Sequence, residues 1–187
     1  MIKFLGSFET VKSLPRLHFP EYAFVGRSNV GKSSLINAIA GAAIARTSKT
    51  PGRTQSLNLF NFDDRFAVMD LPGYGYAKIS KDTQVQWLHR LEDYLLTRSN
   101  LKRLFILIDS RHEVKNSDLE IMDFCDAAGI PYQIVLTKID KSGKAKIAEL
   151  KSALFLKPRP AACAEILDTS ADKKIGIENL KKIIGIK

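Results

Sequence analysis

Short apolar runs alternate with amphipathic stretches along most of this chain. Six runs have the length of buried strands: Tyr22–Val25, Ser56–Phe62, Arg65–Asp70, Leu104–Ile108, Gln133–Leu136 and Glu165–Leu167. This rhythm is typical of an α/β domain whose helices cover both faces of a mostly parallel sheet. Asp63 and Asp64 fit a tight hairpin between the second and third runs, so one of the six strands is expected to be antiparallel.

Apolar residues at helical spacing predict the helices between these strands. The expected segments are Lys32–Ala40, Lys81–Arg98, Ser117–Ala128, a helix capped by Ser142, and a C-terminal helix containing Ile177, Leu180, Ile183 and Ile184. Gly129 is expected to end the third of them. In the second, the expected buried stripe comprises Val85, Leu88, Leu91 and Leu95, and it is widened by the aromatic residues Trp87 and Tyr94.

Length and composition restrict the possible classes of protein. The chain has 187 residues, which suits a single domain spanning 1–187. No apolar run approaches the roughly 20 residues of a membrane-spanning helix, and the N-terminus lacks the pattern of a secretory signal. We therefore expect a cytoplasmic protein without stable membrane insertion. Cys125 and Cys163 have no Cys or His close by in the sequence, so both are expected to be buried thiols.

The charge balance points toward a polyanionic partner. An excess of 29 Lys and Arg over 20 Asp and Glu gives a formal net charge of +9. This charge favours RNA or an anionic membrane surface, although a basic surface that only aids solubility has the same composition. The C-terminal lysines fit either contacts to RNA phosphates or a solvated helix face, and they are Lys173, Lys174, Lys181, Lys182 and Lys187.

A phosphate-binding loop joins the first predicted strand to the first predicted helix. Residues 26–33 read GRSNVGKS, a full match to Gly, four residues, Gly, Lys and Ser or Thr. Glycines let backbone N–H groups approach phosphates, Lys32 adds a positive charge, and the Ser33 hydroxyl would bind Mg²⁺. Nucleotide contacts are expected from Gly26, Arg27, Ser28, Asn29, Val30, Gly31, Lys32, Ser33 and Ser34.

Two further segments would respond to a γ-phosphate. Asp70-Leu71-Pro72-Gly73 directly follows the third predicted strand, where Asp70 would hold Mg²⁺ through water and the Gly73 N–H would reach the phosphate. The segment 41–55 is rich in small and basic residues and is expected to be flexible. Of its threonines, Thr54 in Gly52-Arg53-Thr54 is chosen as a second Mg²⁺ ligand because it lies just before the next strand.

A third pair of motifs distinguishes guanine from adenine. Thr137-Lys138-Ile139-Asp140 ends a predicted strand, and the Asp140 carboxylate can accept hydrogen bonds from the guanine ring N–H and exocyclic amine, which adenine does not present together. The alkyl stem of Lys138 would lie over the base. Thr169-Ser170-Ala171, after the next strand, would supply the other wall and offer the Ala171 N–H to the guanine oxygen.

Three more specific runs accompany these motifs: Arg53-Thr54-Gln55, Pro72-Gly73-Tyr74-Gly75-Tyr76-Ala77 and Asp109-Ser110-Arg111-His112. With them the chain resembles, essentially from end to end, the Era- and TrmE-type GTPases and, within them, the EngB group. The resemblance implies a three-layer P-loop GTPase domain with a six-stranded sheet, GTP or GDP as ligand, Mg²⁺ as cofactor, and a monomer. It also implies association with the large ribosomal subunit or its rRNA during assembly, and a link to normal cell division and septation.

The catalytic chemistry departs from that of Ras-like enzymes. Tyr74 follows Gly73, where Ras-like enzymes have the Gln that orients water, so intrinsic hydrolysis is expected to be slow. In related GTPases an Asn of the phosphate loop helps to bind K⁺, and Asn29 occupies the matching position; activation by K⁺ or by the ribosome is therefore a hypothesis. His112 could be a general base, but bracing the switch region or contacting RNA fits its place after a strand better.

Two other functions would fit parts of the sequence. A small-molecule kinase shares the phosphate loop but needs an acceptor lid or second pocket, whereas the remaining motifs here serve guanine and the γ-phosphate. A basic RNA-binding module whose nucleotide is mainly structural is the main alternative, although the sequence has no recognisable RNA-binding motif. A difference in partner affinity between the two nucleotide states would separate that module from a switch.

Overall fold

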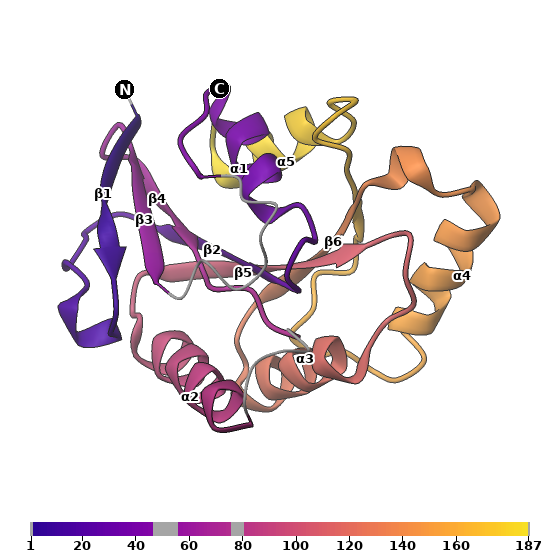
Figure 1. The fold of residues 1–187 in the computed structure, drawn as a ribbon, viewed down its shortest axis with the longest axis horizontal. Coiled ribbons are helices and arrows are strands. Elements are labelled where there is room, and N and C mark those ends of the chain that lie inside the picture. The colour runs from indigo at the N-terminus through magenta and orange to yellow at the C-terminus, as the bar shows by residue number, and fades with distance from the viewer. Residues whose placement is uncertain (1, 47–55, 76–80, 187) are drawn as a thin grey trace.

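One twisted sheet organises the protein, seen in a computed structural model that describes residues 2–46, 56–75 and 81–186 (Figure 1). Its strands are β1 Ile2–Phe8, β2 Glu21–Gly26, β3 Leu57–Phe62, β4 Phe66–Asp70, β5 Leu101–Asp109, β6 Tyr132–Thr137 and β7 Leu167–Asp168. Their order is β1-β3-β4-β2-β5-β6-β7. β3 pairs antiparallel with β1 and with β4, and every other pair is parallel. The expected α/β fold with one antiparallel strand is confirmed.

Helices cover both faces of this sheet (Figure 1). They are α1 Lys32–Ala40, α2 Lys81–Thr97, α3 Asn116–Ala128, α4 Lys144–Leu154 and α5 Ile177–Ile184, with short 3₁₀ turns η1 Val11–Ser13 and η2 Ile139–Lys141. Buried side chains of α1 and α5 share one core, whereas those of α2, α3 and α4 share the other. The molecule is therefore a three-layer sandwich of helices, sheet and helices.

Alternation of side chains along the strands explains the two cores. In β2, Ala23 and Val25 face the α2 and α3 side, while Phe24 faces α1 and α5. Phe24 stacks on Phe105 of β5 with ring centroids 4.8 Å apart, and both rings are fully buried. Burial of each such ring stabilises the fold by about 1.5–3 kcal/mol, which explains why these strands read as continuous apolar runs.

The sheet has one strand more than the six predicted. β1 pairs with β3 at the edge of the sheet, and its register shifts between Phe4 and Gly6. Phe4 is 57% exposed, and no residue of β1 is fully buried. Because an irregular edge strand buries little, its sequence lacks the clean alternation that marks a strand.

Two local predictions were wrong. Ser142 does not cap α4: the N-cap is Gly143, and the Ser142 hydroxyl contacts the Ser110 hydroxyl at 2.9 Å. In α2, Val85 and Leu88 are 52% and 37% exposed, because this helix meets the core through its C-terminal half, where Leu91, Tyr94 and Leu95 are buried.

Two turn predictions were right. Asp63 and Asp64 both have φ of 55° between β3 and β4, as a two-residue hairpin of this kind requires. Gly129 ends α3 with φ of 65°.

The prediction of two buried thiols was right for one cysteine only. Cys125 is buried as expected, and burial raises the pKa of its thiol to about 12, whereas Cys163 is only partly buried.

The order of the strands indicates where a ligand would bind. From β2 the chain passes through α1 to strands on one side, and then through α2 to β5 on the other. Such a switch point in an open α/β sheet leaves a crevice beyond the carboxyl ends of the strands.

No helix among residues 2–46, 56–75 and 81–186 is both long and apolar enough to cross a membrane.

Candidate functional site

The phosphate loop connects β2 to α1 at this switch point. Gly26 leaves no room for a side chain, since a Cβ there would lie 2.9 Å from Val30 Cγ1 and 3.0 Å from the Leu107 carbonyl oxygen. Asn29 and Gly31 adopt positive φ angles of 63° and 104°, and Gly31 is the N-cap of α1. The first N–H groups of a helix have no partner within the helix, so the start of α1 after this turn is suited to bind phosphate.

An ion pair links the loop to the end of β4. The Lys32 ammonium contacts Oδ1 of Asp70, and these residues are only 8% and 3% exposed. Each charge neutralises the other in a place where little water reaches. A nucleotide with Mg²⁺ would offer both groups new partners, with phosphate oxygens for Lys32 and the cation for Asp70.

The donor set near this pair suits Mg²⁺. Ser33 lies half-buried in the first turn of α1 and directly follows Lys32 in the chain. Within the described part of the chain, no cluster of three or more His, Cys, Asp or Glu residues could bind a metal by itself. One hydroxyl and one carboxylate fit the usual Mg²⁺ site at a nucleotide, where phosphate oxygens and water complete the ligands.

The segment after β4 lies directly against the phosphate loop. The Ser28 N–H donates to the Tyr74 carbonyl at 3.0 Å, and the Tyr74 N–H donates to the Gly26 carbonyl at 3.2 Å. A Cβ at Gly73 would lie 3.3 Å from the Ser28 nitrogen and 3.4 Å from the Gly26 oxygen. Gly73 is thus held where its N–H can approach a phosphate bound in the loop. Leu71 is fully buried in the core, which anchors this segment at its start.

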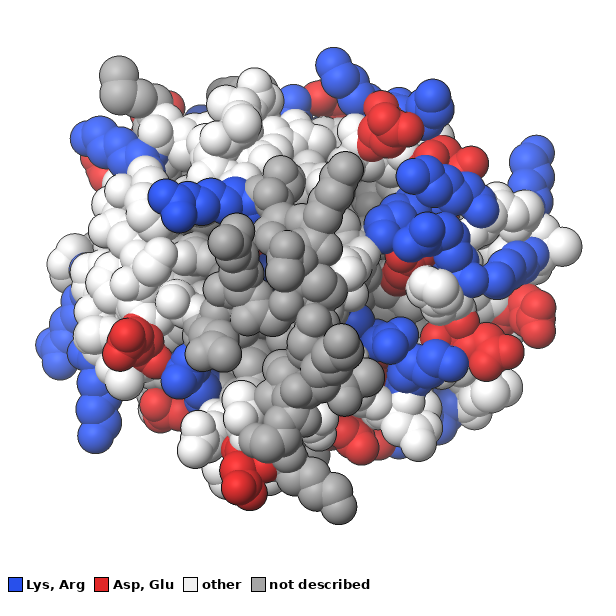
Figure 2. Space-filling model, in the orientation of Figure 1, with Lys and Arg blue, Asp and Glu red and all other residues white. Residues whose placement is uncertain are grey.

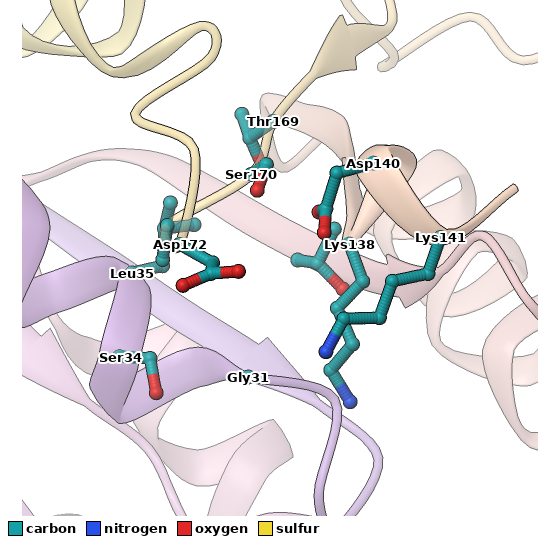
Figure 3. A pocket seen from close by; sticks show the side chains of 11 residues that line it. Gly31, Ser34, Leu35, Lys138, Asp140, Lys141, Thr169, Ser170 and Asp172 are labelled. Atoms are coloured by element: carbon teal, nitrogen blue, oxygen red, sulfur yellow. The ribbon is translucent and has the colours of Figure 1, made fainter.

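A pocket opens beside the loop, between the ends of β6 and β7 (Figure 3). Its walls come from α1, from the segments after β6 and β7, and from the loop itself. The lining residues are Gly31, Ser34, Leu35, Thr137, Lys138, Asp140, Lys141, Thr169, Ser170, Ala171 and Asp172. Both segments with guanine motifs therefore meet at one pocket next to the phosphate loop.

Asp140 supplies the acceptor expected for guanine. Its side chain points into the pocket, and its Oδ1 atom is buried without a hydrogen-bond partner among the described residues (Figure 3). The neighbouring Ser170 hydroxyl lowers the pKa of Asp140 below its usual value, so the side chain is a carboxylate throughout the neutral pH range. A buried acceptor without a partner costs free energy, so a ligand that donates to it gains affinity.

Backbone hydrogen bonds hold the opposite wall. The Thr169 N–H and hydroxyl both donate to the Leu136 carbonyl, at 2.7 and 2.8 Å, and the Ile139 N–H donates to the Thr169 carbonyl at 3.2 Å. The Ser170 N–H donates to the Ile175 carbonyl at 3.0 Å. These bonds fix Thr169 to Ala171 relative to the turn that carries Asp140.

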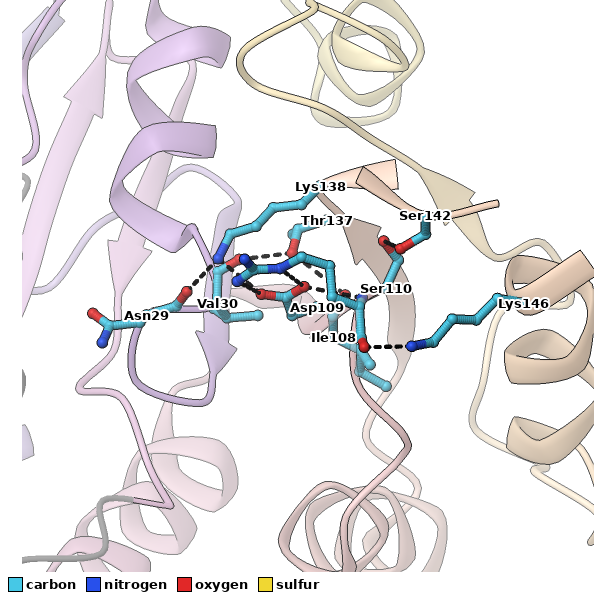
Figure 4. A network of polar contacts seen from close by, with 10 residues as sticks. Asn29, Val30, Ile108, Asp109, Ser110, Thr137, Lys138, Ser142 and Lys146 are labelled. Atoms are coloured by element: carbon cyan, nitrogen blue, oxygen red, sulfur yellow. Dashed lines mark hydrogen bonds and ion pairs between the residues drawn. The ribbon is translucent and has the colours of Figure 1, made fainter. Parts of the chain in front are cut away.

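Lys138 and Thr137 join the pocket to the phosphate loop (Figure 4). The Thr137 hydroxyl donates to the Val30 carbonyl at 2.6 Å, and the Lys138 ammonium donates to the Asn29 carbonyl at 2.6 Å. Lys138 has φ of 58°, a left-handed conformation that is uncommon outside glycine. The Thr137–Lys138 side of the pocket and the phosphate loop are thereby fixed to each other.

Most of the expected nucleotide contacts therefore lie together along one edge of the sheet. Gly52, Arg53 and Thr54 lie outside the described residues, as do Tyr76 and Ala77 of the family-specific run. Sequence reasoning did not expect Leu35, Lys141 and Asp172 in the pocket wall, although each is close in sequence to a motif.

Asp109 is a further residue to which the sequence motifs assign no role. It ends β5 and forms an ion pair with Lys138 at 2.8 Å. Since parallel strands end at a common edge, a carboxylate at the end of β5 next to a lysine at the end of β6 was a usable signal.

Comparison with known proteins gives a consistent result. The family described as "50S ribosome-binding GTPase" matches residues 21–138. A relative from Bartonella bacilliformis, named probable GTP-binding protein EngB, is 46% identical over 97% of this chain and 90% of its own length. The protein of the same name from Sinorhizobium fredii is 47% identical over 95% of this chain and 88% of its own length.

Solved structures show the same fold. A probable GTP-binding protein engB has a TM-score of 0.70 at 24% identity, covering 88% of this chain and 96% of that one. Era, solved with MgGDPNP and nucleotides 1506–1542 of 16S ribosomal RNA, has a TM-score of 0.69 at 27% identity, covering 90% of this chain and 56% of Era.

Proposed function

Because the chain belongs to the EngB group of the family described as 50S ribosome-binding GTPases, we propose that it is a switch in the assembly of the large ribosomal subunit. In this proposal the GTP-bound state binds the ribosomal particle, and hydrolysis to GDP releases it. The single domain acts as a cytoplasmic monomer. The link to cell division and septation rests on the resemblance to the EngB group.

One observation carries the nucleotide part of this proposal. The buried Oδ1 of Asp140 has no hydrogen-bond partner among the described residues and faces a pocket beside the phosphate loop. A guanine ring would supply the two donors that a carboxylate needs. The proposed nucleotide contacts are Gly26 to Ser34, Asp70 to Gly73, Thr137 to Asp140 and Thr169 to Ala171, together with Gly52, Arg53 and Thr54.

We propose Ser33, Thr54 and, through water, Asp70 as the protein's contribution to a Mg²⁺ site. The cation would neutralise charge on the β- and γ-phosphates. Lys32, released from Asp70, would then contact the same phosphates. Gly73 would donate its N–H to the γ-phosphate. Loss of that phosphate would therefore release Gly73 and the segment that follows β4.

Hydrolysis by the protein alone is proposed to be slow. Tyr74 is 4% exposed and its hydroxyl is bonded to Asp118, so this side chain does not replace a water-orienting Gln. The Asn29 side chain is exposed at the phosphate loop, and we propose it as a K⁺ ligand that supplies positive charge during hydrolysis. Equal rates of GTP hydrolysis in K⁺ and Na⁺, for the wild type and Asn29→Ala, would exclude this role.

Surface charge supports an RNA-rich partner. Lys and Arg side chains gather on the side of the molecule where α4 lies in Figure 1 (Figure 2). Five exposed lysines lie on η2, the start of α4 and the turn after β7, namely Lys141, Lys144, Lys146, Lys173 and Lys174. Such a surface attracts RNA phosphates, and the attraction weakens steeply with salt.

The test is binding of the purified protein to large ribosomal subunits at a fixed, moderate salt concentration. Binding is compared with GDP, with a non-hydrolysable GTP analogue, and with the analogue plus Asp140→Asn. We expect tight binding only by the wild type with the analogue. Equal binding in all three conditions would replace the switch by a basic RNA-binding module whose nucleotide is mainly structural.

A further inference from the structure

The Asp109 carboxylate lies next to the pocket but not in its wall. It ends β5 and pairs across the sheet with Thr137, the last residue of β6. Arg111 donates to Oδ1 from its backbone nitrogen at 3.1 Å and from Nε at 2.9 Å, and to Oδ2 from Nη2 at 2.7 Å. Lys138 Nζ donates to Oδ2 at 2.8 Å (Figure 4). Four donors therefore fix the orientation of one carboxylate.

The same contact fixes the course of the Lys138 side chain. Nζ lies between Oδ2 of Asp109 and the Asn29 carbonyl oxygen, and the side chain is only 23% exposed. A Cβ built on Gly31 would lie 3.4 Å from Lys138 Cε, so the stem passes close over the phosphate loop. With its end anchored on both sides, the stem forms a fixed wall of the pocket.

Asp109 is suited to this task by its charge and burial. Burial of this 8% exposed residue would raise the pKa of its carboxyl, but the hydrogen bonds from Arg111 and Lys138 outweigh that effect and hold the pKa well below its usual range. The carboxylate therefore stays ionised across the physiological pH range. Hydrogen bonds between charged partners are stronger than neutral ones, which keeps the lysine in one conformation.

Neighbouring contacts tie the whole segment from Asp109 to Arg111 to the pocket. The Ser110 N–H donates to the Thr137 carbonyl at 3.0 Å, and the Ser110 and Ser142 hydroxyls lie 2.9 Å apart. Lys146 of α4 donates to the Arg111 carbonyl at 2.5 Å. Movement of this segment would therefore be transmitted to the turn that carries Lys138 and Asp140.

We propose that Asp109 is a positioning residue for guanine: it holds the Lys138 stem in the position where the face of the base would pack on it. Arg111 fixes the orientation of the Asp109 carboxylate. The inference rests on the proposed assignment of this pocket to guanine. A lysine without this anchor would lose rotamer freedom only on binding the ligand, which lowers affinity. Asp109 would thus act through Lys138 and would not contact the nucleotide.

A double-mutant cycle tests whether the effect passes through Lys138. The variants are Asp109→Asn, Lys138→Met and the pair together, and the affinity for GDP is measured by calorimetry. We expect Asp109→Asn to weaken GDP binding about tenfold, since it loses a charge-assisted hydrogen bond. In the Lys138→Met background the same change should alter the affinity less than about twofold. Independent, multiplicative effects of the two changes would overturn the proposal.

Inorganic pyrophosphate separates a role at the base from a role at the phosphate loop. It has no base, so Asp109→Asn should leave its affinity within about twofold of the wild type while GDP affinity falls about tenfold. Equal losses for both ligands would show that Asp109 supports the loop instead. If the wild type binds GDP no better than pyrophosphate, the assignment of the pocket to guanine itself fails.

Asp123→Asn is the matched control. Asp123 of α3 is also shared by one lysine and one arginine, Lys157 at 2.5 Å and Arg159. It lies outside the pocket wall, so its loss should affect stability without changing GDP affinity. A comparable loss of GDP affinity in this control would mean that the Asp109 effect reflects general destabilisation, and the proposal would fall.

Discussion

The Tyr74 hydroxyl donates a 2.7 Å hydrogen bond to Oδ1 of Asp118, joining the segment after β4 to α3. The second carboxylate oxygen of Asp118 accepts the Lys115 N–H at 2.9 Å at the start of that helix. The Tyr74 ring packs on Trp87 of α2 with centroids 5.4 Å apart. Burial, and then the adjacent Asp118, raise the pKa of Tyr74 well above its usual value, so the phenol stays protonated as the donor. Tyr74 thus connects the segment after β4 to two helices.

Tyr74→Phe should therefore reduce stability without reducing catalysis. The change leaves a buried oxygen of Asp118 without its donor, which costs about 1–3 kcal/mol of unfolding free energy. Single-turnover hydrolysis of bound GTP should remain within about twofold of the wild type, because the hydroxyl points at α3. Denaturant unfolding and the hydrolysis assay check both parts. A rate that falls tenfold or more would place the hydroxyl at the reacting phosphate.

Removing the counter-charge of a buried carboxylate at the amino end of β2 should strongly lower the free energy of unfolding. Glu21 is fully buried and accepts hydrogen bonds from Tyr94 at 2.5 Å and from Arg98 at 3.0 and 2.7 Å. Arg98→Met leaves the carboxylate without its counter-charge, so we expect a loss of about 3–5 kcal/mol in urea unfolding. GDP affinity should not change, since the pair lies at the opposite end of β2 from the pocket.

Lys181→Met provides the control for Arg98→Met. Lys181 pairs with Glu178 on the exposed face of α5 at 2.8 Å, and exposed pairs contribute less than about 1 kcal/mol. Similar losses in the two variants would show that burial does not set the contribution of the Glu21 pair.

Gly176 should be indispensable for the Thr169 to Ala171 wall. It has φ of 70°, and a Cβ there would lie 2.1 Å from the Asp168 carbonyl oxygen. Gly176→Ala must displace the end of β7, so we expect more than about 2 kcal/mol of destabilisation and weaker GDP binding. Gly185→Ala, at a φ of 85° with no atom within 4 Å, should cost only about 1 kcal/mol and leave GDP affinity intact. Thermal unfolding and calorimetry of both variants distinguish a clash from backbone strain alone.

The hydrogen bonds to Asp109 should account for part of the loss of folding stability at acid pH. Its carboxyl has a lowered pKa in the folded state, so its stabilisation is complete above the unfolded pKa of about 3.9 and is lost as the pH falls toward the folded pKa. The difference in unfolding free energy between the wild type and Asp109→Asn should be constant from pH 7 to about pH 5 and shrink below pH 4. A difference that shrinks between pH 7 and pH 5 would contradict the lowered pKa.

Much of the fold was readable in the sequence because buried parallel strands are continuous apolar runs. The start and end of α1 were predicted correctly, since the phosphate-loop motif precedes it and Gly41 follows it. The edge strand β1 and the exposed half of α2 were missed. In both, the side chains stay largely exposed, so the local pattern does not reveal which neighbours the backbone will have.

The sequence by itself determined which motifs this protein carries and the chemistry they predict: a loop for phosphate, a carboxylate for guanine and an acidic residue at a strand end. Each of these motifs requires particular residue types at a short, fixed spacing, so local sequence is enough to find it. Tertiary structure alone decided the partners that link these motifs. Lys32 meets Asp70, Tyr74 meets Asp118, and Lys138 meets Asp109 across 38, 44 and 29 positions of the chain. Contacts between such distant residues depend on strand order and helix packing, which no local spacing encodes.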